Sequence, residues 1–489
     1  MKKNLIPQES SEAGGFLKKL LGFSLASYLG ALITFAATYI NTRIYDTATM
    51  GKINLFFTVQ TFLLYIAYFG VDQSYCRYYY EYNPSEEKKH LFDVCISISL
   101  YVTILLAVLV FLGWRPLSQY IAGDYSLQVV VALVISIIAM VAWRYLTLLE
   151  RMQHHILLYT ILMVLHSITT KLSFTSISWL TMDVGTSTMA IGVSILLVTV
   201  TFYCVRKQKP SMLNVRLLVR DSMAGRVFKF GLPLMPVSLV SWVNSSIPVL
   251  LLRKFTDYDT VGIYTNAVVL VSIINLVQGG FNTFWVPYYY ENYKTGSNRI
   301  RRVHDVVCVV MVAFAVALIL CKDLIFMILG SDYRSGAIAF ALMLISPVCY
   351  TIGETTGIGI GISEKSYLNT IIYTCGAILN FLISLILIPI MGIIGAAIAV
   401  AISSCTTLVM KTIIGERYYQ VVNSKARTSL ALCFLVISAV VDYVVSGAVR
   451  EILLIIVLLL LLIIYKKDVI FCYESIRTTI SKRLKNDSR

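Results

Sequence analysis

The sequence predicts an all-α, polytopic membrane protein: about 14 transmembrane helices that form two six-helix lobes around a central cavity, plus two extra C-terminal helices. Three observations predict this fold. The 489 residues are 58% hydrophobic and 14% charged, against roughly 25% charged residues in soluble domains. Apolar stretches of about 20 residues, the length that crosses a bilayer as a helix, recur along the whole chain. The two halves of the chain also match each other at a nearly constant offset.

The apolar stretches define the predicted helices in chain order. They lie at residues 16–42, 53–76, 91–113, 126–149, 155–174, 186–205, 230–252, 261–287, 304–329, 335–360, 366–388, 393–415, 428–446 and 449–465. Residues 1–15 are polar and carry no pattern of a cleavable signal peptide. The first helix is therefore expected to remain in the mature protein and to direct insertion.

The basic residues predict the orientation of these helices. With the N-terminus inside, about 32 of the 41 Lys and Arg residues fall in cytoplasmic segments, where such residues concentrate. Both termini are therefore expected to be cytoplasmic. The net charge of +15 is explained by basic residues that orient the helices in the membrane and contact anionic lipids, so no nucleic-acid partner is expected.

An internal repeat predicts the domain organisation. Residues correspond at an offset of about 210. The matching pairs are Gly22 with Gly231, Arg43 with Arg253, Gly51 with Gly262, Tyr78-Tyr79-Tyr80-Glu81 with Tyr288-Tyr289-Tyr290-Glu291, and Val184-Gly185 with Ile394-Gly395. We predict an N-terminal lobe with its basic inner loop at 1–214, a C-terminal lobe at 215–422, and two additional helices with a basic cytoplasmic tail at 423–489.

Charged residues in or near the apolar spans are the candidates for function, because a charge at the bilayer centre costs about 2.5–3.5 kcal/mol and is retained mainly where it faces a polar cavity. The basic candidates for binding a substrate are Arg43, Arg77, Arg144, Lys171, Arg253 and Lys254. The candidates for coupling or gating are Asp72, Glu354 and Pro248, which interrupts the seventh helix. For the basic residues near helix ends, the alternative is that they reach the lipid headgroups.

Other patterns argue against soluble chemistry and against an enzyme. The ten cysteines lack metal-ligand spacing, so neither a metal site nor disulfides are expected. The glycines 357, 359 and 361 lie in an apolar helix and not between a strand and a helix, which disfavours a phosphate-binding loop. A glycosyltransferase or polymerase would need acidic catalytic residues on a sizeable outer loop, and only the short hairpin at Asp257 and Asp259 offers any.

Several motifs resemble the multidrug/oligosaccharidyl-lipid/polysaccharide exporter superfamily, and within it the oligosaccharide flippases of the Wzx type. These motifs are Arg43-Ile44-Tyr45 leading to Gly51, Gly231-Leu232-Pro233, Val261-Gly262-Ile263-Tyr264, Trp285-Val286-Pro287, and Asn380 through Ile388-Pro389 into Gly392-Ile393-Ile394-Gly395-Ala396-Ala397. Relatives often carry an acidic-basic pair in the seventh helix, where this chain has Asn244-Ser245-Ser246, so no substrate or ion role is carried over to that position.

The resemblance implies a function as well as a fold. It implies alternating access in a bacterial inner (plasma) membrane, with a polyprenyl-diphosphate-linked oligosaccharide moving from the inner to the outer leaflet for surface polysaccharide biosynthesis. It implies no cofactor and leaves coupling to a proton or sodium gradient open. Polysaccharide polymerase and glycosyltransferases of the same pathway are the implied partners. The alternatives are a cation-coupled multidrug exporter and a peptidoglycan lipid-precursor flippase of the same superfamily.

Overall fold

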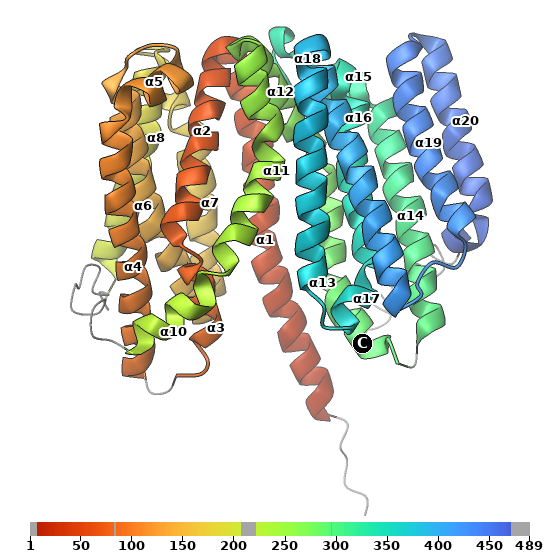
Figure 1. Cartoon of the computed structure of the whole chain (residues 1–489), viewed down its shortest axis with the longest axis horizontal. Helices are drawn as coiled ribbons and strands as arrows, with labels where there is room; N and C mark the ends of the chain where they lie inside the picture. The colour runs from red at the N-terminus through yellow and green to blue at the C-terminus, as the bar shows by residue number, and fades with distance from the viewer. Residues whose placement is uncertain (1–6, 83–84, 207–221, 295, 471–489) are drawn as a thin grey trace, which may run out of the picture. The chain divides into compact units, whose positions relative to one another are not determined.

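The computed structural model describes residues 7–82, 85–206, 222–294 and 296–470, and in these ranges the regular elements are helices (Figure 1). The chain forms two compact units, Met1–Trp242 and Val243–Arg489. The boundary predicted at 214 and 215, most of the basic loop at 206–229 and the end of the basic tail lie outside the described residues. The predicted domain limits therefore remain predictions.

The first unit is a bundle in which α6 packs against α8 and α4, and α1 packs against α7 (Figure 1). Its helices are α1 (Pro7–Ile44), α2 (Thr47–Tyr68), α3 (Val71–Tyr78), α4 (Ser85–Leu112), α5 (Trp114–Ala122), α6 (Leu127–Met152), α7 (Ile156–Leu172), η1 (Thr175–Ile177), α8 (Val184–Val205) and α10 (Ser222–Gly231). The next helix, α11 (Leu234–Phe255), begins in this unit and ends in the second.

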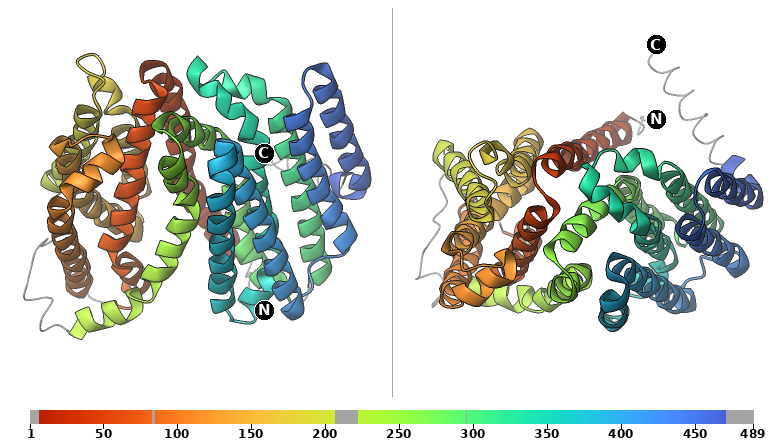
Figure 2. Two further views of the ribbon diagram at one scale, coloured as in Figure 1. Left: turned by 45° about the horizontal axis from the view of Figure 1, so that its top comes forward. Right: turned by 90° about the horizontal axis from the view of Figure 1, so that it is seen from above.

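The second unit is organised around α16, which packs along α18 and α14 (Figure 2). Its further helices are α12 (Tyr258–Val271), α13 (Ile274–Asn292), α14 (Ser297–Leu320), α15 (Lys322–Phe326), η2 (Ser331–Gly336), α16 (Ala337–Thr356), α17 (Ile358–Ile362), α18 (Tyr367–Tyr418), α19 (Lys425–Val444) and α20 (Ala448–Ile464). The final pair, α19 and α20, packs against α14.

The helices confirm the prediction of a multi-pass membrane protein. In the described part of the chain, 9 helices are long and apolar enough to cross a membrane, or up to 10 if α12 and α13, which meet at a bend of 49°, form one span. The helix α18 contains Gly392 with φ 54°, where two helices join across a kink. This position coincides with the gap between the predicted spans 366–388 and 393–415. The predicted total of fourteen spans remains a prediction.

The second predicted span, 53–76, is broken in the structure. The helix α2 ends at Tyr68 because Phe69 and Gly70 both adopt left-handed backbone conformations, with φ 52° and 69°. A side chain at Gly70 would also collide with the backbone of Gly231, since a Cβ built there lies 2.1 Å from the carbonyl oxygen of Gly231. Asp72 consequently lies in the separate short helix α3 and not at the end of α2.

Aspartates at matching places of the two halves begin α2 and α12. The side chain of Asp46 accepts a hydrogen bond from the backbone N–H of Thr49, and Asp257 accepts one from Thr260 at 2.7 Å. These bonds satisfy backbone donors that have no partner inside the helix. The hydrogen bonds from Thr260 also hold the pKa of Asp257 below its ordinary value. Asp257 therefore acts as a helix cap.

Candidate functional site

A proline in α11 opens a polar contact between two helices of the second unit. Pro248 has no N–H, so the carbonyl of Asn244, four residues earlier, loses its helical donor. The side-chain amide of Asn380 in α18 supplies the missing hydrogen bond at 3.1 Å and also lies 3.2 Å from the Asn244 side-chain oxygen. Asn380 is itself buried, and its oxygen accepts a hydrogen bond from Ser384. The contact satisfies polar groups that would be costly to bury alone.

A cavity of about 410 Å³ lies beside this contact, within the range of roughly 300–1,000 Å³ that is typical of small-molecule sites. Its lining residues come from α11, α12, α13, α16 and α18. The polar residues that line it are Asn244, Ser245, Tyr264, Ser272, Asn275, Gln278, Ser346, Tyr350, Asn380, Ser403 and Ser404, with Pro248 among the apolar ones. These are neutral hydrogen-bonding groups, and among the described lining residues none carries a formal charge.

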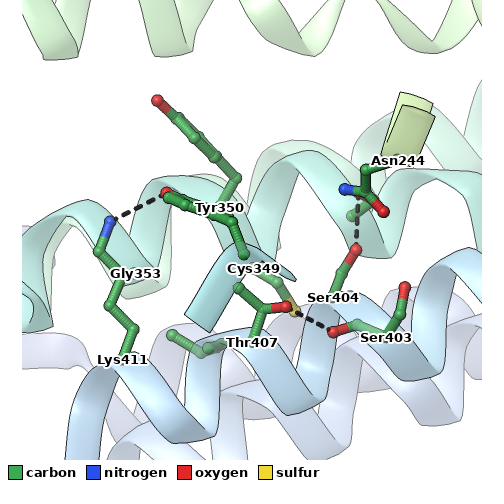
Figure 3. A pocket seen from close by; sticks show the side chains of 11 residues that line it. Asn244, Cys349, Tyr350, Gly353, Ser403, Ser404, Thr407 and Lys411 are labelled. Atoms are coloured by element: carbon green, nitrogen blue, oxygen red, sulfur yellow. Dashed lines mark hydrogen bonds between the residues drawn. The ribbon is translucent and has the colours of Figure 1, made fainter. Parts of the chain in front are cut away.

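A smaller cavity of about 90 Å³ adjoins the first and shares part of its lining (Figure 3). The shared residues are Asn244, Ser346, Tyr350, Ser403 and Ser404. Lys411 also lines the smaller cavity, and its amino group donates a hydrogen bond to the hydroxyl of Tyr373 at 3.2 Å.

The Lys411 ammonium is paired with the Glu354 carboxylate across α18 and α16. The Nζ atom lies 2.6 Å from Glu354 Oε1, and the Tyr373 hydroxyl lies 3.5 Å from the same oxygen. The backbone carbonyl of Glu354 accepts a hydrogen bond from the indole N–H of Trp285 at 3.0 Å, which anchors this turn of α16 to α13. The charge of Lys411, which lines the smaller cavity, is therefore neutralised by Glu354 in a fixed geometry.

The sequence candidates in the second unit divide between this site and the end of α11. Pro248 lines the large cavity, and Glu354 holds Lys411 at the end of the small one. The guanidinium of Arg253 lies 4.0 Å from the ring centre of Tyr258 and donates to its hydroxyl. Lys254 lies over the ring of Phe255. Arg253 and Lys254 are thus placed at a helix end, outside the described lining of either cavity.

Two candidates of the first unit meet each other. The Arg144 guanidinium in α6 binds the Asp72 carboxylate in α3, with Nη2 at 2.9 Å and Nε at 3.3 Å from the same oxygen. Asp72 is buried, with 7% of its side chain exposed, whereas Arg144 is exposed by 38%. The guanidinium also lies 5.9 Å from the ring centre of Tyr68. The pair joins α3 to α6 and leaves part of the arginine accessible.

The other basic candidates of the first unit lie apart from that pair. Arg43 stacks on the ring of Tyr39 at 3.6 Å in the last turns of α1. Arg77 is exposed and pairs with Glu81 one turn later. Lys171, near the end of α7, lies 5.0 Å from the ring centre of Phe57. Their proposed contact with a substrate remains a prediction.

The sequence reasoning missed Lys411 and the neutral lining residues. Lys411 lies in the predicted span 393–415, so the rule that selected Glu354 as a charge inside an apolar span also applies to it. Asn275 and Gln278 carry no comparable signal, because a neutral amide in an apolar helix is indistinguishable in sequence from one that faces lipid headgroups or a neighbouring helix.

Solved structures with the same fold are membrane transport proteins. The lipid II flippase MurJ in an inward closed conformation matches with a TM-score of 0.68 and 14% identity, over 93% of this chain and 99% of that one. An inward-facing multidrug resistance transporter of the MATE family, in the MOP superfamily, matches with a TM-score of 0.52 and 14% identity, over 82% of this chain and 95% of that one. The comparison with curated proteins finds no match.

The family comparison extends over more than half of the chain. Residues 16–292 match the family described as "Polysaccharide biosynthesis protein". Together with the fold, this match agrees with the expectation of a multi-pass membrane protein associated with polysaccharide biosynthesis. The Wzx-type assignment is finer than this match. The chain belongs to the polysaccharide biosynthesis protein family and has the fold of the MOP superfamily.

Proposed function

We propose that this protein flips a polyprenyl-diphosphate-linked oligosaccharide from the inner to the outer leaflet of a bacterial inner membrane, as a flippase of the Wzx type. The observation that carries the proposal is the cavity of about 410 Å³ in a bundle of membrane helices, whose described lining is uncharged and combines eleven hydrogen-bonding side chains with six apolar ones. Polar side chains are costly in such a bundle unless they are satisfied. A saccharide, with donors and acceptors on every ring, offers them many partners at once.

The same cavity disfavours the multidrug alternative. A cationic drug would be attracted by an unpaired carboxylate. Glu354, the carboxylate that contacts Lys411 in the lining of the smaller cavity, is already paired with this lysine at 2.6 Å. A diphosphate that carries about two negative charges outward across an inside-negative membrane gains roughly 4–5 kcal/mol per 100 mV.

The diphosphate is proposed to be held by the basic residues of the first unit. Arg144 remains partly exposed beside Asp72, and Arg43 and Lys171 lie over aromatic rings in α1 and α7. Simultaneous replacement of Arg43, Arg144 and Lys171 by alanine is expected to slow flipping, because each removes a charge that could accompany the diphosphate. An unchanged rate would remove these residues from the proposal.

The direct test is transport in proteoliposomes. A radiolabelled polyprenyl-diphosphate oligosaccharide is placed in the vesicles, and an impermeant glycosidase reports whether its sugar crosses. Gln278→Leu should slow the flipping because it removes a hydrogen-bonding group from the cavity, and Gln420→Leu, an exposed glutamine outside the cavity lining, is the matched control. Lipid II and a cationic dye serve as alternative substrates. Transport of either one, without transport of the oligosaccharide, would refute the proposal.

A further inference from the structure

The electrostatic balance of the cavity depends on one ion pair. The described residues that line the large cavity are all uncharged, and Lys411 is the charged residue in the lining of the small one. Lys411 is buried, with 7% of its side chain exposed, and Glu354 is partly exposed at 25%. Removal of either partner would therefore leave a net charge next to the cavity.

We propose that Glu354 makes this cavity selective for uncharged saccharide residues by neutralising Lys411, an inference that rests on the proposed function and specifies its substrate class. Under this proposal the neutral sugars of the cargo enter the cavity of the second unit. Acidic sugars, which carry a carboxylate, are rejected by it.

The geometry explains why the lysine does not attract an acidic sugar. An ammonium group has three N–H donors and no acceptor, and Lys411 donates two of its hydrogen bonds to Glu354 and Tyr373. A second carboxylate at the same position would lie close to Glu354 and be repelled by it. It would also lose its hydration without gaining a cation of its own, which is unfavourable in a confined site.

Neutral sugar hydroxyls meet no such penalty. The amides of Asn275 and Gln278 can both donate and accept hydrogen bonds, and the serines 346, 403 and 404 can do the same. A hydroxyl group that exchanges water for these partners keeps its hydrogen bonds. The lining therefore accommodates the group that all neutral sugars share and provides no compensation for an added charge.

Three variants separate charge from shape. Glu354→Gln keeps the size of the side chain and exposes the charge of Lys411, so the cavity should gain affinity for acidic sugars. Lys411→Met keeps roughly the length of the lysine and removes the cation that pairs with Glu354, so the affinity of the cavity for acidic sugars should stay low. The combined variant Glu354→Gln/Lys411→Met has no charge at this position and should restore the preference of the parent for neutral sugars.

The experiment measures equilibrium binding to the full-length protein in nanodiscs. The probes are radiolabelled maltotriose, a neutral trisaccharide, and trigalacturonate, its acidic counterpart of equal length. The parent should bind maltotriose in preference to trigalacturonate. In Glu354→Gln the affinity for trigalacturonate should rise by roughly tenfold or more, which is the expected effect of a hydrogen bond to a charged group. Retention of maltotriose binding shows that the variant is folded.

A fourth variant keeps the charge fixed. A lysine that loses its carboxylate partner in a buried site can release its proton, whereas an arginine stays charged. Glu354→Gln/Lys411→Arg should therefore gain trigalacturonate affinity whether or not the lysine variant does. Equal affinities of the parent for the two probes, or no gain in either charged variant, would overturn the proposal.

The outcome is independent of flipping. The probes carry no lipid and no diphosphate, so their binding reports the cavity alone. If the proteoliposomes transport the lipid-linked oligosaccharide and the parent binds both probes equally, the proposed function stands and the specificity assigned to Glu354 falls. If selective binding is found without transport, the cavity recognises neutral sugar and the flippase proposal fails.

Discussion

Replacement of Asn380 by leucine should destabilise the second unit because it removes the donor that serves the Asn244 carbonyl. Asn380 is 1% exposed, whereas Asn244 is half-buried and lines the cavity, so water can replace only part of the lost hydrogen bonding. A buried carbonyl left without a donor costs about 1–3 kcal/mol. Leucine has the same branching of side-chain heavy atoms as asparagine but is larger, so it leaves no void, and any cost of its extra bulk applies equally in the two backgrounds compared below.

The proline provides the internal control. Pro248→Ala restores an N–H four residues after Asn244, and the helix can then satisfy that carbonyl by itself. In the Pro248→Ala background, Asn380→Leu should therefore cost clearly less than in the parent. The difference between the two costs is the coupling energy of Asn380 and Pro248, expected at about 1–2 kcal/mol for residues that share one hydrogen-bond network.

The assay is thermal unfolding of the four proteins in the same detergent, followed by intrinsic fluorescence and by far-UV circular dichroism. For a unit of this size, about 1 kcal/mol corresponds to a shift of roughly 2–4 °C in the unfolding midpoint. Asn380→Leu alone should lower the midpoint by several degrees. An equal loss in both backgrounds would show that Asn380 does not act through the carbonyl that Pro248 leaves without a donor.

Three further predictions concern other parts of the fold. Lys322→Met removes the partner that lies 2.6 Å from the buried carboxylate of Asp442 and leaves it Arg450 at 3.6 Å. This variant should lower the unfolding midpoint more than Lys322→Met combined with Asp442→Leu, in which no poorly compensated carboxylate is buried and Arg450 keeps its contacts with Asp323 and Glu451. Asp257→Ala should lower the free energy of unfolding by about 1 kcal/mol at neutral pH. Because the fold lowers the pKa of Asp257, the stabilisation from its carboxylate is present above the ordinary carboxyl pKa and is lost as the pH falls through the lowered pKa. The difference in unfolding midpoint between the variant and the parent should therefore become smaller in acid. Gly392→Ala should cost about 1–3 kcal/mol of stability because φ is 54° at this position, although a Cβ would meet no neighbouring atom within 4 Å. Gly225→Ala inside α10, where a Cβ is equally free of contacts, is the control and should be neutral or slightly stabilising. Equal effects of the two changes on the unfolding midpoint would contradict the assignment to backbone strain.

Much of the helical framework could be predicted because a membrane span is a local property of the chain. A run of about 20 apolar residues satisfies its own backbone as a helix in lipid, whatever its neighbours are. The predicted spans 428–446 and 449–465 correspond to α19 and α20, and the gap before 393 coincides with the kink at Gly392. The break after Tyr68 was missed, because it depends on the close approach of Gly70 to Gly231, which are distant in sequence.

The candidate site was predicted in part for the same reason. A charge or a proline inside an apolar run is visible in the sequence, and this signal selected Glu354 and Pro248. Their partners, Lys411 and Asn380, lie 57 and 132 positions further along the chain, in α18. No local pattern in the sequence shows that α16 and α11 meet α18.

The sequence by itself therefore indicated which segments are apolar enough to form membrane helices and where polar groups are retained at a cost, since both follow from the transfer of single residues from water to hydrocarbon. Residues 16–292 also carry the match to the polysaccharide biosynthesis protein family. Only the tertiary structure decided that Lys411 is neutralised by Glu354 and that neutral side chains of five helices line one cavity. It also decided that Asn380 donates a hydrogen bond to the backbone carbonyl of Asn244, which has no helical donor because residue 248 is a proline. Pairing and enclosure depend on distances between helices, and these distances are fixed by side-chain packing across the whole unit.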